Sequence, residues 1–331
     1  MRQPLTIVMY HYVHERGRRN FGRLVGRSFE EFQGQLDHIQ RHYTVIDADR
    51  FFDALKRGRP LPANACMLTF DDGYRIHHSV VFKALRERGL RGFFFPPARP
   101  VAERIMLDVH KIHFALATDV SHAEIAHRLR DWIDGSAMTF GLESSAHYWR
   151  TYAKPSRFDP AETIFIKRVL QKGLPEAARA AAVDWLFRRF ADRDEATLSA
   201  SFYMQENELK EMVRAGMYVG SHGYAHRWLD TMNEADQSRD IDLSLSLLSS
   251  IGAPTADWIM CYPYGGQNSG LIDLLRRRRC IAGVTTRIAV AAVGADDPLL
   301  LPRLDTNDLP LAVGYEPAEV DLRSISVAAA G

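Results

Sequence analysis

The sequence predicts an α/β protein in which strands and helices alternate, as in the parallel βα units of a barrel or a doubly wound sheet. Two observations predict this class. Short apolar runs are each followed by a stretch whose apolar residues recur at helical spacing, and the Asn-Gly pairs typical of tight hairpins are absent. In such folds the reactive groups lie at the carboxyl ends of the strands. The residues that follow each predicted strand are therefore the candidates for chemistry.

The first hundred residues follow this alternation. One helix begins after Ser28, which can form a capping box with Glu31, and a later helix ends at Gly89. The predicted strands here are 5–9, 43–46, 65–70 and 92–95, and the predicted helices are 29–39 and 76–88.

Between residues 101 and 201 the pattern changes to long helical stretches without a convincing strand. We expect residues 1–100 and 202–331 to form the α/β body, and 101–201 to form a helical insertion beside it or a lid over its mouth. Core packing is the expected role of the tryptophans in this insertion, with sugar stacking as the alternative, for Trp132, Trp149 and Trp185.

After the insertion the alternation of strand and helix resumes. The predicted strands are 217–220, 258–261, 281–285 and 299–301, and the predicted helices are 206–215, 241–251 and 271–279. The last of these helices closes with four arginines, Arg276–Arg279. We expect a solvated face there, and a contact with phosphates of a lipid or nucleotide carrier is the alternative.

Composition indicates an ordinary globular protein. Of 331 residues, 46% are hydrophobic and 25% are charged, which allows a sizeable core. The net charge of +1 argues against a nucleic-acid partner. The three cysteines lie far apart and predict neither a disulfide framework nor a zinc ribbon. We expect a cytoplasmic protein, because no secretory signal or membrane span of about 20 apolar residues is evident, with membrane contact only through a lipid-linked substrate.

Two adjacent carboxylates, Asp71 and Asp72, directly follow the predicted strand 65–70, and Gly73 permits a sharp turn after them. Adjacent like charges repel and are costly to desolvate. The pair is best explained if a cation neutralises one partner and the other serves as a base. A polar loop capped by aspartate is the alternative interpretation of this stretch alone.

Two histidines four residues apart, His222 and His226, follow the predicted strand 217–220. One turn of chain would direct both imidazoles toward one point, and with a carboxylate they would form a facial set of metal ligands with open positions. Gly223 stands where the His-Glu-x-x-His motif of zinc proteases has its glutamate, so that class is excluded. Both pairs lie at predicted carboxyl ends of strands.

Three motifs occur in the order seen in the polysaccharide deacetylases, the NodB-homology proteins of carbohydrate esterase family 4. They are Thr-Phe-Asp-Asp-Gly at 69–73, Ser-His-x-x-x-His at 221–226 and Tyr-Pro-Tyr-Gly at 262–265. The chain resembles this family over roughly residues 5–97 and 202–305. The resemblance implies a distorted (β/α) barrel of about seven parallel strands and metal-dependent hydrolysis of N-acetyl groups on amino sugars.

The resemblance also implies a role for each matching residue. Asp71 would be the general base, and Asp72, His222 and His226 would hold a divalent metal. The backbone N–H of Tyr264 would share the oxyanion with that metal. Zinc is the expected ion, with cobalt, nickel and manganese as alternatives.

The chain departs from the family pattern at two places. Many members have at position 261 an arginine that orients the catalytic aspartate, and Cys261 stands here. Arg303 is the candidate replacement, and an ordinary surface arginine is the alternative. The late Leu-x-His motif that supplies the general acid is also absent. His11 ends the first strand, next to the last strand of a closed barrel, and resembles the histidine that a Tyr-His variant of the family uses as acid.

The resemblance therefore predicts a metal-dependent deacetylase of an amino-sugar glycan or of a lipid-linked or nucleotide-linked intermediate. The motifs are equally compatible with removal of a formyl or another small acyl group from the nitrogen. A catalytically silent member that binds glycan or a partner protein is one alternative. A metal-dependent amidohydrolase that acts on a non-sugar amide is another. The sequence does not indicate an oligomeric state.

Overall fold

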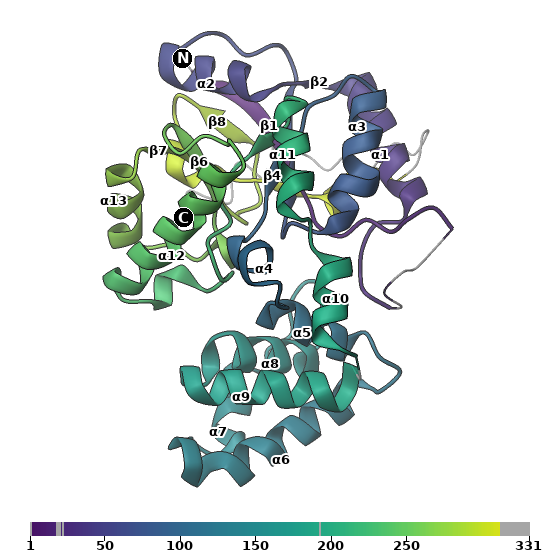
Figure 1. The fold of residues 1–331 in the computed structure, drawn as a ribbon, viewed down its shortest axis with the longest axis vertical. Coiled ribbons are helices and arrows are strands. Elements are labelled where there is room, and N and C mark those ends of the chain that lie inside the picture. Colours follow the sequence, from purple (N-terminus) through teal and green to yellow (C-terminus); the bar gives the residue numbers. More distant parts are fainter. Residues whose placement is uncertain (1, 18–20, 22, 192, 312–331) are drawn as a thin grey trace. The chain divides into compact units, whose positions relative to one another are not determined.

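Parallel strands that close into a ring form the centre of the barrel (Figure 1). Direct pairing joins the first four strands of the ring, and the last strand pairs with the first. Single bridges, Ser221 with Met260 and Val284 with Leu301, attach the remaining pair on its two sides. In ring order the strands are β1 (Gln3–Tyr10), β3 (Ala65–Asp71), β4 (Phe93–Phe95), β5 (Tyr218–Val219), β6 (Trp258–Cys261), β7 (Cys280–Val284) and β9 (Leu304–Asp305).

This ring confirms the α/β class and the distorted (β/α) barrel. Two further strands flank it: β2 (Thr44–Val45) runs parallel to β3, and β8 (Ala291–Val293) runs antiparallel to the start of β1. The antiparallel strand was not predicted. A run of three small or β-branched residues carries too little apolar pattern to be distinguished from a loop.

The structure is a computed structural model that describes residues 2–17, 21, 23–191 and 193–311. Of these, residues 2–17, 26–103 and 200–311 form a barrel unit, and residues 21, 23–25, 104–191 and 193–199 form a helical unit. The sequence division, with an insertion at 101–201, placed residues 19–25 in the barrel. Residues 312–331, the end of the predicted barrel segment, lie outside the described residues.

Helices surround the ring in the barrel unit. They are α1 (Phe29–His42), α2 (Ala48–Arg57), the π-helical η1 (His77–Phe82), α3 (Lys83–Glu87), α4 (Ala98–Glu103), α11 (Glu206–Arg214), α12 (Glu234–Ser250) and α13 (Ser269–Arg277), with 3₁₀ turns η4 (Leu229–Thr231), η5 (Pro263–Gly265), η6 (Pro298–Leu300) and η7 (Thr306–Asp308). The predicted capping box of α1 is confirmed, since Ser28 and Glu31 each accept a hydrogen bond from the other's backbone N–H.

Some predicted elements differ from the observed ones. The helix α2 was not predicted. The predicted strand 299–301 is mostly the 3₁₀ turn η6, because Pro298 starts a helical turn that Asp297 caps. Helix α12 begins at Glu234 rather than at the predicted residue 241, and Asn233 is its N-cap. Its buried face includes polar side chains, which hide the apolar period from a sequence reading.

Alternation along the strands determines which side chains enter the barrel. In β3, Cys66, Leu68 and Phe70 pack against the outer helices. Met67 belongs to the inner cluster, with residues of β4, β6 and β7. Because successive side chains point to opposite faces, Asp71 follows Met67 and Thr69 toward the inside. The carboxylate thus enters the interior at the carboxyl end of its strand.

The helical unit has its own core. Buried Lys111 donates to Asp184 at 2.7 Å and pairs with Glu195 at 3.0 Å, which joins three of its helices. The predicted packing role of the tryptophans agrees with ring contacts, since all three pack partly buried against this core. Its helices are α5 (Asp108–Leu116), α6 (His122–Phe140), α7 (Ser145–Tyr152), α8 (Ala161–Arg168), η2 (Val169–Gly173), α9 (Glu176–Leu186), η3 (Phe187–Ala191) and α10 (Glu195–Phe202), which ends inside the barrel unit.

In the part of the chain that the structure describes, every helix is too short or too polar to cross a bilayer.

A buried histidine, His77, contacts the backbone of His11, the predicted general acid. His77, at the start of η1, packs against Phe70, Tyr74 and Phe94. Its Nε2 lies 2.8 Å from the backbone oxygen of His11 and donates to it. Burial lowers the pKa of His77 from 6.5 to about 4, despite this hydrogen bond, so the ring is neutral at physiological pH. The hydrogen bond holds the backbone at the end of β1.

This lowered pKa predicts a specific acid sensitivity. Between pH 6.5 and about 4 the unfolded chain binds a proton at His77 that the folded chain does not, so stability from the neutral ring is lost as pH falls through this window. Between pH 7 and pH 5 the free energy of unfolding should fall by about 2 kcal/mol more in the wild type than in His77→Gln. Urea titrations at both pH values measure this difference, and equal pH dependence in the two proteins would contradict it.

Candidate active site

Two carboxylates at the end of β3 begin the site. Asp71 is the last residue of the strand and is 1% exposed. Asp72 and Gly73 follow in left-handed backbone conformations, with φ of 71° and 67°. A Cβ on Gly73 would lie 2.8 Å from Cβ of Pro96, so only glycine fits this turn. The turn rotates the Asp72 side chain away from that of Asp71, and the two adjacent acids meet different partners.

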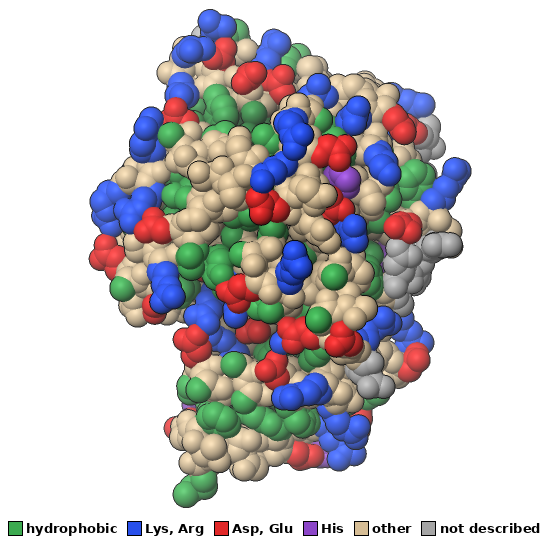
Figure 2. Space-filling view, in the orientation of Figure 1, with side chains coloured by type: hydrophobic (Ala, Val, Ile, Leu, Met, Phe, Trp, Pro, Cys, Tyr) green, Lys and Arg blue, Asp and Glu red, His purple; other side chains and the backbone are tan. Residues whose placement is uncertain are grey.

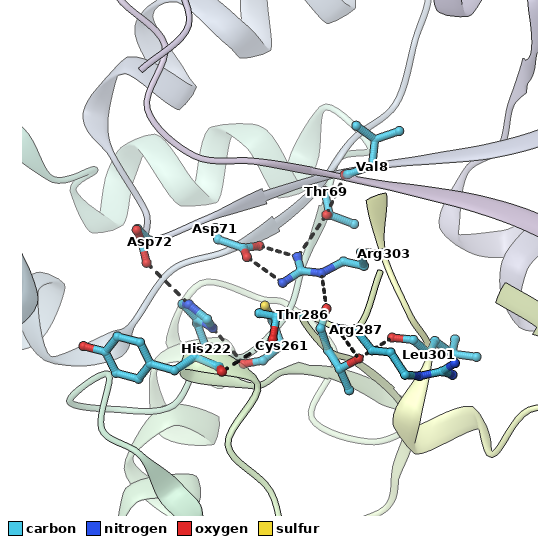
Figure 3. A network of polar contacts seen from close by, with 12 residues as sticks. Val8, Thr69, Asp71, Asp72, His222, Cys261, Thr286, Arg287, Leu301 and Arg303 are labelled. Atoms are coloured by element: carbon cyan, nitrogen blue, oxygen red, sulfur yellow. Dashed lines mark hydrogen bonds and ion pairs between the residues drawn. The ribbon is translucent and has the colours of Figure 1, made fainter. Parts of the chain in front are cut away.

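Arg303 pairs with Asp71 through two parallel contacts (Figure 3). Its Nη1 and Nη2 each lie 2.8 Å from one oxygen of the carboxylate. Nη1 also donates to Thr69 Oγ1 at 3.1 Å, and Nε donates to the backbone oxygen of Thr285 at 2.9 Å. Arg303 is 1% exposed, which excludes the surface arginine that was the alternative interpretation. The guanidinium therefore fixes the orientation of Asp71.

This pairing determines the charge state of Asp71. Burial alone would raise its pKa, but the Arg303 guanidinium, with smaller contributions from His222 and His11, holds the pKa below its usual value. Asp71 is therefore ionised at neutral pH. An ionised carboxylate that cannot rotate is a suitable proton acceptor.

Cys261 ends β6 close to this pair. Its thiol, an Asp71 oxygen and a His222 nitrogen all lie within 4.8 Å of one another. Burial raises the pKa of the thiol, so it is neutral. The guanidinium missing from position 261 comes instead from position 303, and a small neutral side chain at 261 leaves space for it (Figure 3).

Asp72 meets the two histidines that the sequence singled out. Its Oδ1 lies 3.1 Å from Nε2 of His226 and 3.4 Å from Nε2 of His222. One donor atom from each of the three residues falls within 4.8 Å of the others, and all three are buried. A carboxylate oxygen and two imidazole nitrogens are ligands that zinc and similar ions accept. This donor set fits a divalent metal.

Neighbouring groups orient these donors. His222 Nδ1 lies 2.7 Å from the backbone oxygen of Cys261 and donates to it, which orients Nε2 toward Asp72, where its lone pair would be available to a metal. Tyr74 donates its hydroxyl to Asp72 Oδ2 at 2.6 Å. Burial, followed by the Asp72 charge, raises the pKa of Tyr74, so the hydroxyl stays a donor. The sequence analysis missed Tyr74, although it stands two residues after Asp72.

Tyr264 and His11, the other two predicted site residues, lie at the same end of the barrel. The Tyr264 ring is 4.6 Å from that of His226 and stacks on Trp228 at 4.8 Å, with 7° between the planes. His11 is exposed and follows Tyr10, which pairs with Phe70, so it is level with Asp71. The seven predicted site residues thus come from four strand ends and from the residue before β9: Asp71 and Asp72, His222 and His226, His11, Tyr264, and Arg303.

Three of these residues adopt strained backbone conformations. Asp72, His226 and Tyr264 have φ of 71°, 52° and 58°, in the left-handed region that non-glycine residues rarely adopt. Each such residue costs on the order of 1–3 kcal/mol and persists only where the surroundings enforce it. Such strain concentrates at functional sites.

The arginine run 276–279 lies apart from these groups, and its first three arginines form ion pairs. Arg276 contacts Asp273 and Asp297, Arg277 contacts Glu234, and Arg278 contacts Asp242. Figure 2 shows basic and acidic side chains next to each other over α12 and α13. This arrangement agrees with the expected solvated face.

Comparison with known proteins gives the family. Residues 180–279 match the family model described as polysaccharide deacetylase. This segment belongs to the polysaccharide deacetylase family. The matched segment contains His222, His226 and Tyr264, and the family recognised from the motifs is thereby confirmed. The family indicates a hydrolase that acts on amide bonds, with a carbohydrate as its substrate. No curated protein sequence matches the chain.

Solved structures similar to this chain share its barrel fold. The deacetylase PplD of Streptococcus pyogenes is 15% identical, with a TM-score of 0.55 over 92% of this chain and 93% of that one. IcaB of Ammonifex degensii is 17% identical, with a TM-score of 0.51 over 91% of each chain. A de-N-acetylase of Aggregatibacter actinomycetemcomitans is 14% identical, with a TM-score of 0.50 over 92% and 96%.

Removing Arg303 should destabilise the deacetylase domain more than removing a surface partner. In Arg303→Met the buried Asp71 charge loses its counterion, and the free energy of unfolding should fall by about 3–5 kcal/mol. The double variant Asp71→Asn/Arg303→Met should recover most of this loss. Denaturant titrations measure both, with Lys210→Met, which breaks an exposed pair with Glu206, as a control expected to lose less than about 1 kcal/mol. A loss in Arg303→Met no larger than that control would contradict the assignment.

Proposed function

We propose that the chain hydrolyses the N-acetyl group of an amino-sugar residue in a glycan or glycoconjugate, with the help of a divalent metal, zinc in the first instance. One observation carries the proposal: a buried Asp72–His222–His226 donor set lies beside an ionised carboxylate, Asp71, that a buried arginine holds in one orientation. A metal ligand set next to a fixed base is suited to the hydrolysis of an unactivated amide.

In this proposal Asp72, His222 and His226 hold the metal. When bound, a divalent ion supplies Lewis-acid chemistry, which polarises a carbonyl group and makes water more acidic. Asp71 accepts the proton of the attacking water on one of its carboxylate oxygens. Arg303 keeps that carboxylate ionised and fixed until the proton is transferred to it.

His11 and Tyr264 complete the reaction. Water first adds to the acyl carbon to give a tetrahedral oxyanion, and the bond from that carbon to nitrogen breaks when the oxyanion collapses. The leaving amine needs a proton, which His11 donates from the end of β1. Tyr264, in its left-handed conformation, presents its backbone N–H to the oxyanion. Acetate and a free amino sugar are the products.

The comparisons support the substrate class. PplD is a deacetylase whose structure was solved with acetate, the acid that N-deacetylation releases. The Aggregatibacter relative is a de-N-acetylase. The cytoplasmic location and the lipid or nucleotide carrier stay predictions of the sequence. So do the two alternative functions, the silent binding protein and the hydrolase of a non-sugar amide.

Two aspartate variants test the metal and the base separately. Asp71→Asn should retain zinc and lose about 10²–10⁴-fold in the rate of N-acetyl removal. Asp72→Asn should lose zinc as well as activity. Mass spectrometry of N-acetylhexosamine oligosaccharides measures deacetylation, and elemental analysis measures zinc. Full activity in Asp71→Asn would refute the assigned base. A wild type that binds glycan but removes no acetyl group would favour the silent binding protein.

A change of leaving group tests His11. An amine must be protonated to leave, whereas p-nitrophenolate leaves without a proton. His11→Gln should therefore lose about 10²-fold on an N-acetylated oligosaccharide and keep most of its activity on p-nitrophenyl acetate. Asp71→Asn serves as the control, because it should lose activity on both substrates. Equal losses of His11→Gln on both substrates would show that His11 is not the acid.

A further inference from the structure

The segment that carries the two histidines is short and irregular, yet its backbone is held at every residue between them. Gly223, Tyr224 and Ala225 separate His222 from His226, with φ of 70° at Gly223 and 52° at His226. No helix or strand includes this segment. Its conformation must therefore come from groups outside it.

A buried carboxylate on α12 accepts two hydrogen bonds from this segment. Asp240 Oδ1 accepts from the N–H of Tyr224 at 2.7 Å, and Oδ2 accepts from the N–H of Ala225 at 3.2 Å. Asp240 is 5% exposed, so its charge has lost most of its hydration. Both carboxylate oxygens are used, one for each of two consecutive N–H groups. An amide in this place would offer one acceptor oxygen, and its NH₂ would face the other N–H group.

The same helix and a second one hold the rest of the segment. Ser244, one helical turn after Asp240, lies 2.7 Å from the hydroxyl of Ser221, and this hydroxyl accepts from the N–H of Gly223 at 3.1 Å. The backbone oxygens of Gly223 and Tyr224 accept from Ala98 and Arg99 of α4, at 3.1 and 2.9 Å. The helices α4 and α12 contact one another (Figure 1).

The approach of Asp240 to the segment is as close as sterics allow. A Cβ on Gly223 would lie 2.8 Å from Asp240 Oδ1, a separation that ordinary Cβ atoms do not show. Glycine is therefore required at 223 both for its left-handed backbone and for this contact. The close approach of the Asp240 carboxylate thus explains why position 223, where the zinc proteases have a glutamate, is a glycine.

We propose that Asp240 is a positioning residue for the metal site: it fixes the segment 222–226 so that both imidazoles face Asp72. The inference rests on the proposed function, because it concerns the ligands of the proposed metal. Asp240 does not touch those ligand atoms. It acts through the backbone N–H groups of Tyr224 and Ala225. Burial of the Asp240 carboxylate costs free energy, and the hydrogen bonds from these two N–H groups, which fix the geometry of the segment, offset that cost.

Metal affinity tests this role directly. In Asp240→Asn one N–H of the segment faces an amide NH₂, and zinc affinity should fall by about 10–100-fold, measured by competition with a chromophoric chelator. The visible spectrum of the cobalt-substituted protein should also change, because ligand geometry shifts. Asp242→Asn is the matched control. It lies on the same helix, pairs with Arg278 at the surface and should bind zinc like the wild type.

Gly223→Ala provides a second variant, should Asp240→Asn fail to fold. Its methyl group pushes the segment away from Asp240 from the other side, so zinc affinity should fall in the same way. Wild-type zinc affinity and cobalt spectra in the folded variants would overturn the role of Asp240 and leave the proposed function standing. A wild type that binds neither metal would overturn the proposed metal-dependent function, and this inference with it.

Discussion

The ion pair between Arg303 and Asp71 is the interaction on which the rest of the site depends. It brings together the end of β3, the segment after β7 and the residues that lead into β9. An unpaired carboxylate inside the barrel would be costly, and it would be protonated and unable to serve as a base. With the charge of Asp71 offset, the chain can turn at Asp72 and direct the second carboxylate toward the histidines. Two adjacent acids thereby acquire unequal environments.

The source of the guanidinium shows how a site can keep its chemistry while its residues change. The orienting arginine expected at position 261 is absent. Arg303, which directly precedes β9, supplies the guanidinium instead. The neutral thiol of Cys261 lies beside His222, where the family pattern would place the arginine. The charge of Asp71 is thus offset from position 303 rather than from position 261. Closure of the ring places β9 next to β1, so that a residue near the end of the barrel reaches Asp71.

The sequence was sufficient for the fold class and for the residues that meet at the barrel end, because strand ends and motifs are local features. Asp71, Asp72, His222 and His226 each follow a recognisable apolar run. Groups that act from a distance were harder to find. Asp240 stands in the middle of a helix with a weak apolar pattern, and nothing near it in the sequence indicates that it faces Gly223. Tyr74 carried a local signal, its place beside the acidic pair, and was overlooked. The antiparallel strand β8 is too short to show a period.

The left-handed backbone at Asp72, His226 and Tyr264 has an evolutionary consequence. Glycine or asparagine at any of these positions would relax the chain, and selection for heat tolerance alone would favour these replacements. A thermostabilised descendant selected without an activity screen would tend to lose these side chains first. At Asp72 and His226 such a replacement would remove a proposed metal ligand in exchange for a less strained backbone, whereas at Tyr264 it would keep the backbone N–H.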